Sequence, residues 1–188
     1  MTSPSPDFSF FASTPVVNAK TGKTYTLDKI TALTPDDRTL SDLVRICNEP
    51  AIYDFLFRER LKGATYTAED ARGFLAWGSK GWAEKAYFVF IVRDEHGHIA
   101  AATDIRANTL VESEVGYWAS SKHSGIMTPT LNALTKVALR AGYAALMAYV
   151  RLDNDRSRQV LLTNGFTQEP GEFVNKGKTG RHVFRKTL

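Results

Sequence analysis

The sequence predicts an α+β domain in which hairpin strands are combined with amphipathic helices, and three observations carry this prediction. Residues 87–92 form a nearly continuous apolar run, typical of a strand that is buried on both faces. Across the turn Asp94-Glu-His-Gly97, residues 99–105 return as a second strand and predict a hairpin. Residues 111–142 then pass from strand-like alternation through a polar loop to helical periodicity.

Size and composition predict one compact domain. The chain has 188 residues, of which 43% are hydrophobic, enough to bury a sizeable core. We expect a single domain over residues 23–188, without an internal repeat. Residues 1–22 are rich in Ser, Pro and Thr and predict an N-terminal arm that is partly flexible, although three phenylalanines suggest that part of it packs down.

The first half of the domain is predicted to hold one strand and two helices. Residues 23–33 alternate between apolar and polar side chains and predict the strand. A helix is predicted to begin at Thr34-Pro-Asp-Asp37, where acidic residues suit the helix dipole, and to end at Pro50. The second helix is predicted to begin at Thr67-Ala-Glu-Asp70. Residues 51–66, between the helices, are apolar but not cleanly periodic.

The second half is predicted to continue with a helix, a strand, a short helix and a hairpin. The first of these helices should end at Gly142, because glycine readily takes the left-handed conformation of a helix cap. Residues 144–150 predict the strand, and residues 154–164 predict a short helix capped by Asn154. Residues 166–188 predict a closing hairpin with a Gly/Lys-rich turn at 175–180.

Composition excludes several classes of protein. Cys47 is the single cysteine, which excludes an internal disulfide and a multi-cysteine metal site and suits a reducing compartment. The sequence has no apolar run long enough to span a bilayer and no signal-peptide pattern at its start, so we expect a soluble, cytoplasmic protein.

Two further features are interpreted as ordinary surface. His96 and His98 flank Gly97 in the hairpin turn, and without other ligands nearby they are taken as polar loop residues, so no metal site is expected. The net charge of +4 comes from the basic residues 151–188. We take this region as a solvated surface, although it could help to attract an acidic cofactor or a ribosomal partner.

Residues 112–128 are the stretch around which a function is predicted. A strand leads through a polar loop containing Gly125 into Thr128-Pro129, which predicts a helix start, because threonine can cap the first turn and proline leaves no amide unsatisfied. Loop amides and the positive end of the helix dipole would then converge. This geometry suits an anion.

Several short motifs occur in an order that resembles the GNAT acyl-CoA N-acyltransferases. They are Glu114-Val-Gly-Tyr-Trp118, Gly125-Ile-Met-Thr128, Asn154-Asp-Arg-Ser157 and Asn164-Gly-Phe166. The resemblance extends from about residue 24 to the C-terminus and is closest to the branch that acetylates ribosomal-protein N-termini. It implies the GNAT fold, with a mixed, mostly antiparallel central sheet flanked by helices, and acetyl-CoA as co-substrate.

The chain departs from the family in one loop. The family's Gln/Arg-x-x-Gly-x-Gly pattern is here Ser120-Ser-Lys-His-Ser-Gly125, which keeps only the last glycine and looks about two residues shorter. His123 stands where a glycine would let the backbone approach a diphosphate most closely. The side chains of Lys122 and His123 could restore part of the attraction as donors, so the affinity for acetyl-CoA stays open.

The resemblance implies a set of cofactor-binding residues. The diphosphate is expected on the amides of the loop and helix start, and the pantetheine arm beside the strand carrying Tyr117 and Trp118, where it is splayed from residues 144–150. Asn154 is expected to anchor the cofactor arm, and it is equally well explained as a helix cap. The expected set is Trp118, Ala119, Lys122, His123, Ser124, Gly125, Ile126, Met127, Thr128, Asn154 and Ser157.

Glu114 and Ser157 are predicted to carry the chemistry. Glu112 and Glu114 alternate onto one face of their strand, and Glu114 is predicted to be the general base, acting through water, if that face lines the acceptor cleft. The equal alternative is a solvent-facing carboxylate pair. By the resemblance, Ser157 lies near the sulfur and donates to the leaving thiolate. The aromatic residues within 51–66 are either the family's wall of the acceptor cleft or core.

The sequence therefore predicts an acetyl-CoA-dependent N-acetyltransferase that acts on a primary amine, first of all a protein N-terminal α-amine, by direct attack on the thioester. The alternatives are an acyl-CoA-binding module without turnover, a small-molecule or polyamine acetyltransferase, and an RNA- or ribosome-binding domain without a recognisable nucleic-acid motif. We expect no membrane partner and no specific nucleic acid. An exposed strand edge would allow a homodimer.

Overall fold

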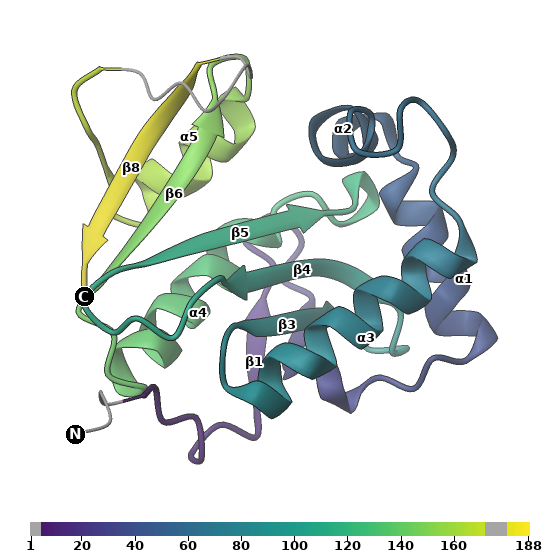
Figure 1. The fold of residues 1–188 in the computed structure, drawn as a ribbon, viewed down its shortest axis with the longest axis horizontal. Coiled ribbons are helices and arrows are strands. Elements are labelled where there is room, and N and C mark those ends of the chain that lie inside the picture. The colour runs from purple at the N-terminus through teal and green to yellow at the C-terminus, as the bar shows by residue number, and fades with distance from the viewer. Residues whose placement is uncertain (1–4, 172–179) are drawn as a thin grey trace.

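A single eight-stranded sheet runs through the computed structural model, which describes residues 5–171 and 180–188 (Figure 1). The strand order is β1-β2-β3-β4-β5-β6-β8-β7. Neighbouring strands are antiparallel except β5 and β6, which are parallel, so the predicted mixed, mostly antiparallel sheet is confirmed. The strands are β1 (Ser13–Val17), β2 (Thr24–Lys29), β3 (Phe88–Arg93), β4 (Ile99–Ile105), β5 (Ser113–Ala119), β6 (Ala145–Arg151), β7 (Thr167–Gln168) and β8 (Arg181–Thr187).

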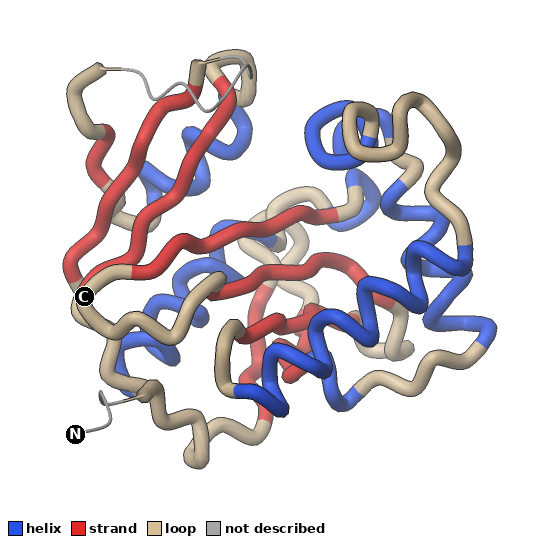
Figure 2. The backbone as a smooth tube through the Cα atoms, viewed as in Figure 1, coloured by secondary structure: helices blue, strands red, loops and turns tan. Residues whose placement is uncertain are grey.

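Helices cover both faces of the sheet (Figure 2). α1 and α3 lie over β3 and β4 on one face, α4 lies on the opposite face, and α5 lies behind β6 and β8. Within the described residues, no helix is both long and apolar enough for a membrane span. The helices are α1 (Asp37–Cys47), α2 (Pro50–Ile52), which continues into a π-helical turn (Tyr53–Phe57), α3 (Ala68–Glu84), α4 (Met127–Arg140) and α5 (Asp155–Thr163), with 3₁₀ turns at Ile30–Ala32 and Ser121–His123.

The predicted hairpin of β3 and β4 forms the middle of the core. Phe88 and Phe90 of β3 pack toward α4, whereas Val89 and Ile91 pack toward α1 and α3, so the strand is buried on both faces as its apolar run predicts. α1 and α3 begin where their cap signals indicate, because Asp36 caps α1 and Thr67 opens a capping box for α3.

The N-terminal residues extend the sheet, where the sequence predicted a partly flexible arm. β1 pairs antiparallel with β2, and the side chains of Phe8 and Phe11 are only 6% and 5% exposed. The Phe8 ring lies 4.5 Å from that of Phe88, measured between centroids. A short edge strand containing Pro15 is hard to predict from sequence, because proline weakens a strand pattern yet is tolerated at a sheet edge.

α4 begins earlier than predicted, and Thr128 does not cap it. The helix starts at Met127, and the residue before it, Ile126, already has helical dihedral angles (φ −76°, ψ −30°) and offers no side-chain cap. Ile126 is fully buried and Met127 is 7% exposed. Burial of these two apolar side chains draws the preceding turn into the helix, which overrides the local signal of Thr128-Pro129.

The C-terminal residues close the sheet beside β6. β8 pairs antiparallel with β6 along its whole length and with the short β7 on its other side. The turn predicted at 175–180 lies, apart from Gly180, outside the described residues.

Candidate active site

β5 and β6 share backbone pairs at only two positions, Ser113 with Leu146 and Glu114 with Met147. Beyond these pairs the strands diverge, β5 toward α2 and β6 toward α5 (Figure 1). In the described part of the chain, residues 115–119 therefore have no backbone partner on the β6 side. The expected splay is present, and it leaves the amides and carbonyls of one β5 edge available to an extended ligand.

Tyr117 and Ser157 join the two diverging arms. The Tyr117 hydroxyl lies 2.7 Å from Ser157 Oγ and donates to the Ser157 carbonyl at 3.1 Å. Burial raises the pKa of Tyr117 to about 12, so the phenol remains protonated near neutral pH. Asn154 caps α5 as predicted, because its Oδ1 accepts from the Ser157 amide at 3.1 Å. The cap and the hydroxyl thus form one small cluster.

The loop between β5 and α4 is held by the β1–β2 hairpin. Asn18 Nδ2 donates to the Ser124 carbonyl at 3.2 Å, and Lys20 Nζ donates to Ser124 Oγ at 3.0 Å. The Tyr25 hydroxyl lies 2.9 Å from Nδ1 of His123. A part of the chain distant in sequence therefore brings a positive charge, Lys20, to the loop where an anion was predicted.

Gly125 is required by both conformation and space. Its φ is +96°, a left-handed value that favours glycine. A Cβ added there would lie 2.7 Å from Lys20 Cγ and 2.8 Å from Asn18 Oδ1. The glycine therefore allows the hairpin to approach the loop.

The side chain of His123 points toward β2. Its ring packs edge-on against that of Tyr25, with centroids 5.6 Å apart, and its Nδ1 is engaged by the tyrosine hydroxyl. Burial lowers the pKa of the imidazole, which is therefore neutral at pH 7. A cationic donor role for this ring is not supported by the geometry, whereas Lys122 is exposed on the loop.

A carboxylate from the α1–α2 junction also binds the loop. Glu49 accepts a hydrogen bond from Ser120 Oγ and another from the Ser121 amide, both at 2.6 Å, and Arg45 lies 3.6 Å from it. Although burial opposes it, these hydrogen bonds lower the pKa of Glu49, which is therefore ionised at neutral pH. One loop amide is thus taken by the protein itself.

Other amides at the start of α4 remain available for an anion. The Lys122, His123 and Ile126 amides are bonded within the loop. Across residues 5–171 and 180–188 the structure supplies no acceptor for four further amides, and because the helix start is uncapped these amides suit a diphosphate. They are the amides of Ser124, Gly125, Met127 and Thr128.

The remaining predicted cofactor residues flank this cluster. Trp118 packs toward α3, with its ring 6.2 Å from that of Phe74, while the adjacent Ala119 packs on the α4 side of the sheet. The backbone of Ala119 faces the gap. By alternation, the backbone of Trp118 instead points to β4, where the residue pairs with Ala102, so the expected backbone contact of Trp118 with the cofactor is not supported.

Glu114 lies on the face of β5 that α1 and α3 cover, in a short charged network. Arg106 bonds both Glu114 and Asp104, the latter at 3.0 Å. Burial raises the pKa of Glu114 above its ordinary value, and Arg106 only partly opposes this effect. Gly116 leaves room for the arginine, because a Cβ there would lie 2.4 Å from Arg106 Nη2.

Glu112 and Glu114 do not converge on one partner. Glu112 bonds Arg185 of β8, whereas Glu114 bonds Arg106 beside β4. Arg185 also reaches Glu169 at 3.3 Å. Glu112 therefore helps to hold β8 beside the start of β5. The side chain of Glu114, in contrast, is only 28% exposed.

The aromatic residues after Pro50 form an incompletely buried surface. Tyr53, Phe55 and Phe57 are half-buried in the π-helical turn, and none of its residues is part of the buried core. Arg151, at the end of β6, lies over the Phe55 ring at 4.8 Å. This contact crosses from the α2 side to the β6 side of the splay, as a wall of an acceptor cleft would.

Sequence reasoning did not single out Tyr117, Arg106, Lys20 or Glu49. Each reaches the site by a tertiary contact: Tyr117 and Ser157 are 40 residues apart, and Glu49 and Ser121 are 72 apart. The sequence contains no local signal for such contacts. Alternation did provide one usable clue, because Tyr117 lies on the face of β5 opposite Glu114.

A splayed pair of parallel strands, with an uncapped helix start after the first, suits an acyl-CoA cofactor. A family model described as the acetyltransferase (GNAT) domain matches residues 29–167. The chain therefore belongs to the GNAT acetyltransferase family, with acetyl-CoA as co-substrate.

Solved structures share this fold. RimJ of Mycobacterium smegmatis, in complex with CoA-disulfide, has a TM-score of 0.72 and 18% identity over 93% of this chain and 86% of that one. A Salmonella typhimurium acetyl transferase that modifies the N-terminal serine of the 50S protein L7/L12 has a TM-score of 0.67 and 18% identity over 87% and 95%. The Vibrio fischeri ribosomal-protein-S5-alanine acetyltransferase has a TM-score of 0.61 and 24% identity over 87% and 92%. A comparison with curated sequences gives no significant match.

Proposed function

We propose that this acetyltransferase acts on the α-amine at a protein N-terminus. The observation that carries the proposal is the gap between β5 and β6, with the carboxylate of Glu114 on one face of β5 and the hydroxyls of Tyr117 and Ser157 on the other. Structural neighbours that modify the N-termini of ribosomal proteins favour this class of acceptor.

Residues at the start of α4 would hold the cofactor. The amides of Ser124, Gly125, Met127 and Thr128 suit its diphosphate, and Lys20 adds a positive charge beside them. The unpaired edge of β5 from Val115 would receive its peptide-like arm. When bound, acetyl-CoA supplies an acetyl thioester that an amine can attack.

Glu114 is suited to accept a proton from an α-amine, directly or through water. An ammonium at a protein N-terminus has a pKa of about 7.7–8.0, whereas that of lysine is about 10.4, so the former needs the weaker base. Burial raises the pKa of Glu114, while the ion pair with Arg106 opposes this effect and favours the charged carboxylate. Arg106, directly after β4, orients the carboxylate by donating to it.

Ser157 is suited to supply a proton on the other side of β5. Its hydroxyl can donate into the gap and be resupplied by the Tyr117 hydroxyl, which lies 2.7 Å away and remains protonated. Asn154 fixes the position of Ser157 by accepting from its amide. In this scheme β5 separates the group that takes a proton from the group that gives one.

A product assay tests the proposal. The full chain is incubated with acetyl-CoA and three matched amines: a peptide with a free N-terminus and no lysine, an N-blocked peptide with one lysine, and a polyamine. We expect acetylation of the first, and a loss of turnover on the order of 10²-fold in Ser157→Ala and Glu114→Gln. Glu112→Gln, which alters only the contact with Arg185, is the control. A preference for the polyamine or the blocked peptide would reject the acceptor class.

A second candidate is an acyl-CoA-binding module without turnover, and two observations favour it. Glu49 occupies one loop amide, and the imidazole of His123 is turned to Tyr25. Calorimetric titration with acetyl-CoA separates the candidates: binding without product across the amine panel would support the module. Binding that is lost in Gly125→Ala but accompanied by product in the native chain would support the enzyme.

A further inference from the structure

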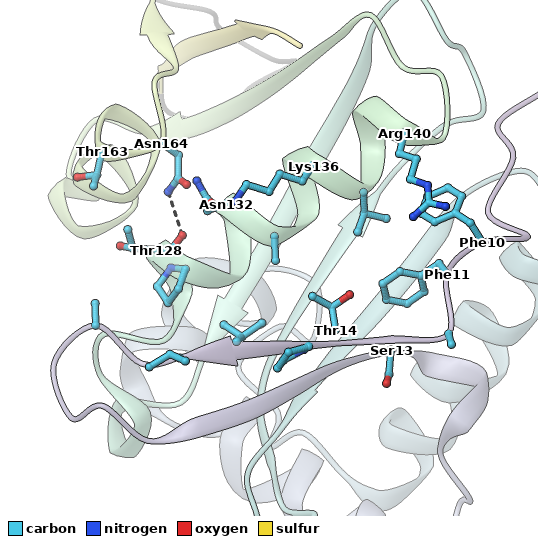
Figure 3. Close-up of a pocket in the computed structure, with 18 residues that line it drawn as sticks. Phe10, Phe11, Ser13, Thr14, Thr128, Asn132, Lys136, Arg140, Thr163 and Asn164 are labelled. Atoms are coloured by element: carbon cyan, nitrogen blue, oxygen red, sulfur yellow. Dashed lines mark hydrogen bonds between the residues drawn. The ribbon is translucent and has the colours of Figure 1, made fainter.

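A groove of about 710 Å³ lies between β1 and α4, and its Thr128 end adjoins the amides that suit a diphosphate (Figure 3). β1 and α4 run side by side in opposite directions, so the groove is elongated. Phe10 and Arg140 lie at one end, and Thr128 and Asn164 lie at the other. An elongated groove beside a strand suits an extended chain.

The groove carries positive charge without a compensating carboxylate. Lys136 and Arg140 are four residues apart on α4, so they lie one turn apart on the same side of the helix. Among the described residues, no aspartate or glutamate lines the groove and neither cation has an ion-pair partner. The Arg140 guanidinium stacks on Phe10, 4.1 Å from the ring centroid, which holds it at the rim.

β1 is the outermost strand, and its free edge faces outward. The Asn18 amide donates to the Lys23 carbonyl at 2.8 Å, which sets the phase of hydrogen bonding between β1 and β2. By alternation, the backbone groups of Ser13 and Val17 point away from β2, while Pro15 offers only its carbonyl. An extended chain can therefore pair at both ends of the strand but not at its middle.

We propose that this groove binds an extended acidic segment of another polypeptide. Alternate side chains of an extended chain are about 6.6–6.8 Å apart, and successive helix turns about 5.4 Å, so two alternate carboxylates can meet Lys136 and Arg140. Because Pro15 weakens backbone pairing, charge would provide much of the affinity. A second copy of this chain fits less well, because pairing through β1 would bring like-charged helices together.

The test is fluorescence anisotropy of the full chain with a short labelled peptide in which valine and glutamate alternate. We expect saturable binding that weakens with salt and falls at least about tenfold when Lys136 and Arg140 are both changed to glutamate. Lys80→Glu, at an exposed position of α3, is the control and should leave binding unchanged. Equal binding by the double variant, or by a valine–lysine peptide, would overturn the proposal.

A second measurement addresses the strand edge without altering the protein. N-methylation of alternate amides of the peptide should weaken binding when the methylated edge faces β1, and should have little effect in the other register. Equal effects in both registers would overturn the placement beside β1. Displacement of the peptide by single-stranded RNA at lower concentration than by unlabelled peptide, or a dimer in sedimentation that excludes the peptide, would assign the groove to another partner.

Discussion

Glu114 and Tyr117 leave β5 on opposite faces, and this alternation sets the proposed chemistry. Glu114 shares its face with Gly116 and Trp118, whereas Tyr117 reaches Ser157 on the α5 side. An amine can thus lose a proton on one face while the leaving group gains one on the other. The glycine at 116 is part of the arrangement, because its missing side chain leaves room for Arg106.

The pH dependence of turnover should report Glu114. Burial raises its pKa above 4.5, so kcat/KM should be retained above this raised pKa and lost as the pH falls through it. The acid limb should therefore lie at a higher pH than for an exposed glutamate. In Glu114→Gln the limb of the carboxylate should disappear together with most activity, leaving the limb of the acceptor α-amine at about 7.7–8.0, while Glu112→Gln should keep both. A full pH–rate profile of the three proteins is the measurement, and an unchanged limb in Glu114→Gln would place the base elsewhere.

Gly125 and Gly22 have similar backbone conformations and can serve as test and control positions. Both have positive φ, +96° and +70°, so alanine at either should cost about 1–2 kcal/mol of stability. Only at position 125 would the new Cβ meet other atoms, those of Lys20 and Asn18. We expect Gly125→Ala to weaken acetyl-CoA binding and Gly22→Ala to leave it intact, by titration calorimetry with urea unfolding as the stability check. Equal affinities would remove this loop from the cofactor site.

In α3, packing against neighbouring residues decides whether a glycine can be replaced by alanine. A Cβ added at Gly73 would have no atom of another residue within 4 Å, whereas a Cβ at Gly81 would lie 2.3 Å from Tyr87 Cε2. Both residues lie inside the same helix, so their intrinsic helix propensity is the same. The packing against the segment before β3 makes the difference.

Gly73→Ala should stabilise the protein by about 0.5–1 kcal/mol, because glycine costs this much in a helix interior. Gly81→Ala should destabilise it by about 1–3 kcal/mol through overpacking against Tyr87. Urea unfolding of the two variants gives both values. If both variants changed the free energy of unfolding in the same direction, helix propensity and not packing would determine the effect of these substitutions.

Elements with a strong local pattern could be predicted from the sequence, and elements set by tertiary contacts could not. The run at 87–92 and the cap at Asn154 lead to β3 and α5 as observed. β1 was not predicted, because its polar composition and Pro15 suggest an arm. The start of α4 was placed too late, because the burial of Ile126 has more effect on the helix start than the capping signal of Thr128. In the site, Asn154 and Ser157 are three residues apart and could be paired from sequence.

At the scale of the whole molecule, the N-terminal residues are part of the core. Phe8 packs among aromatic rings of α3 and β3, with Trp82, Phe88 and Phe90 all within 6 Å between centroids. β1 also supplies one wall of the groove along α4. Stability and the proposed binding surface therefore depend on the same segment.

Phe8→Ala should lower the free energy of unfolding by about 3–5 kcal/mol, because it leaves a cavity among the rings of Trp82, Phe88 and Phe90. Val111→Ala, at a side chain that is 77% exposed, should change it by no more than about 0.5 kcal/mol. Urea denaturation followed by tryptophan fluorescence compares them. Equal stability of the two variants would mean that the N-terminal segment packs only loosely.

The two backbone pairs between β5 and β6 have a mechanical consequence. They leave β6, β7, β8 and α5, here called the flap, joined to β5 by backbone pairs only at Ser113–Leu146 and Glu114–Met147. Side-chain contacts hold the flap elsewhere: Leu161 and Phe184 pack in the core shared with α4, and Ser157, Arg151 and Asn164 contact Tyr117, Phe55 and the Thr128 carbonyl. Amides of this flap should exchange with deuterated solvent faster than those of β3 and β4. A cofactor bound between β5 and β6 would contact both strands and should therefore slow amide exchange across the whole flap, including amides that it does not contact.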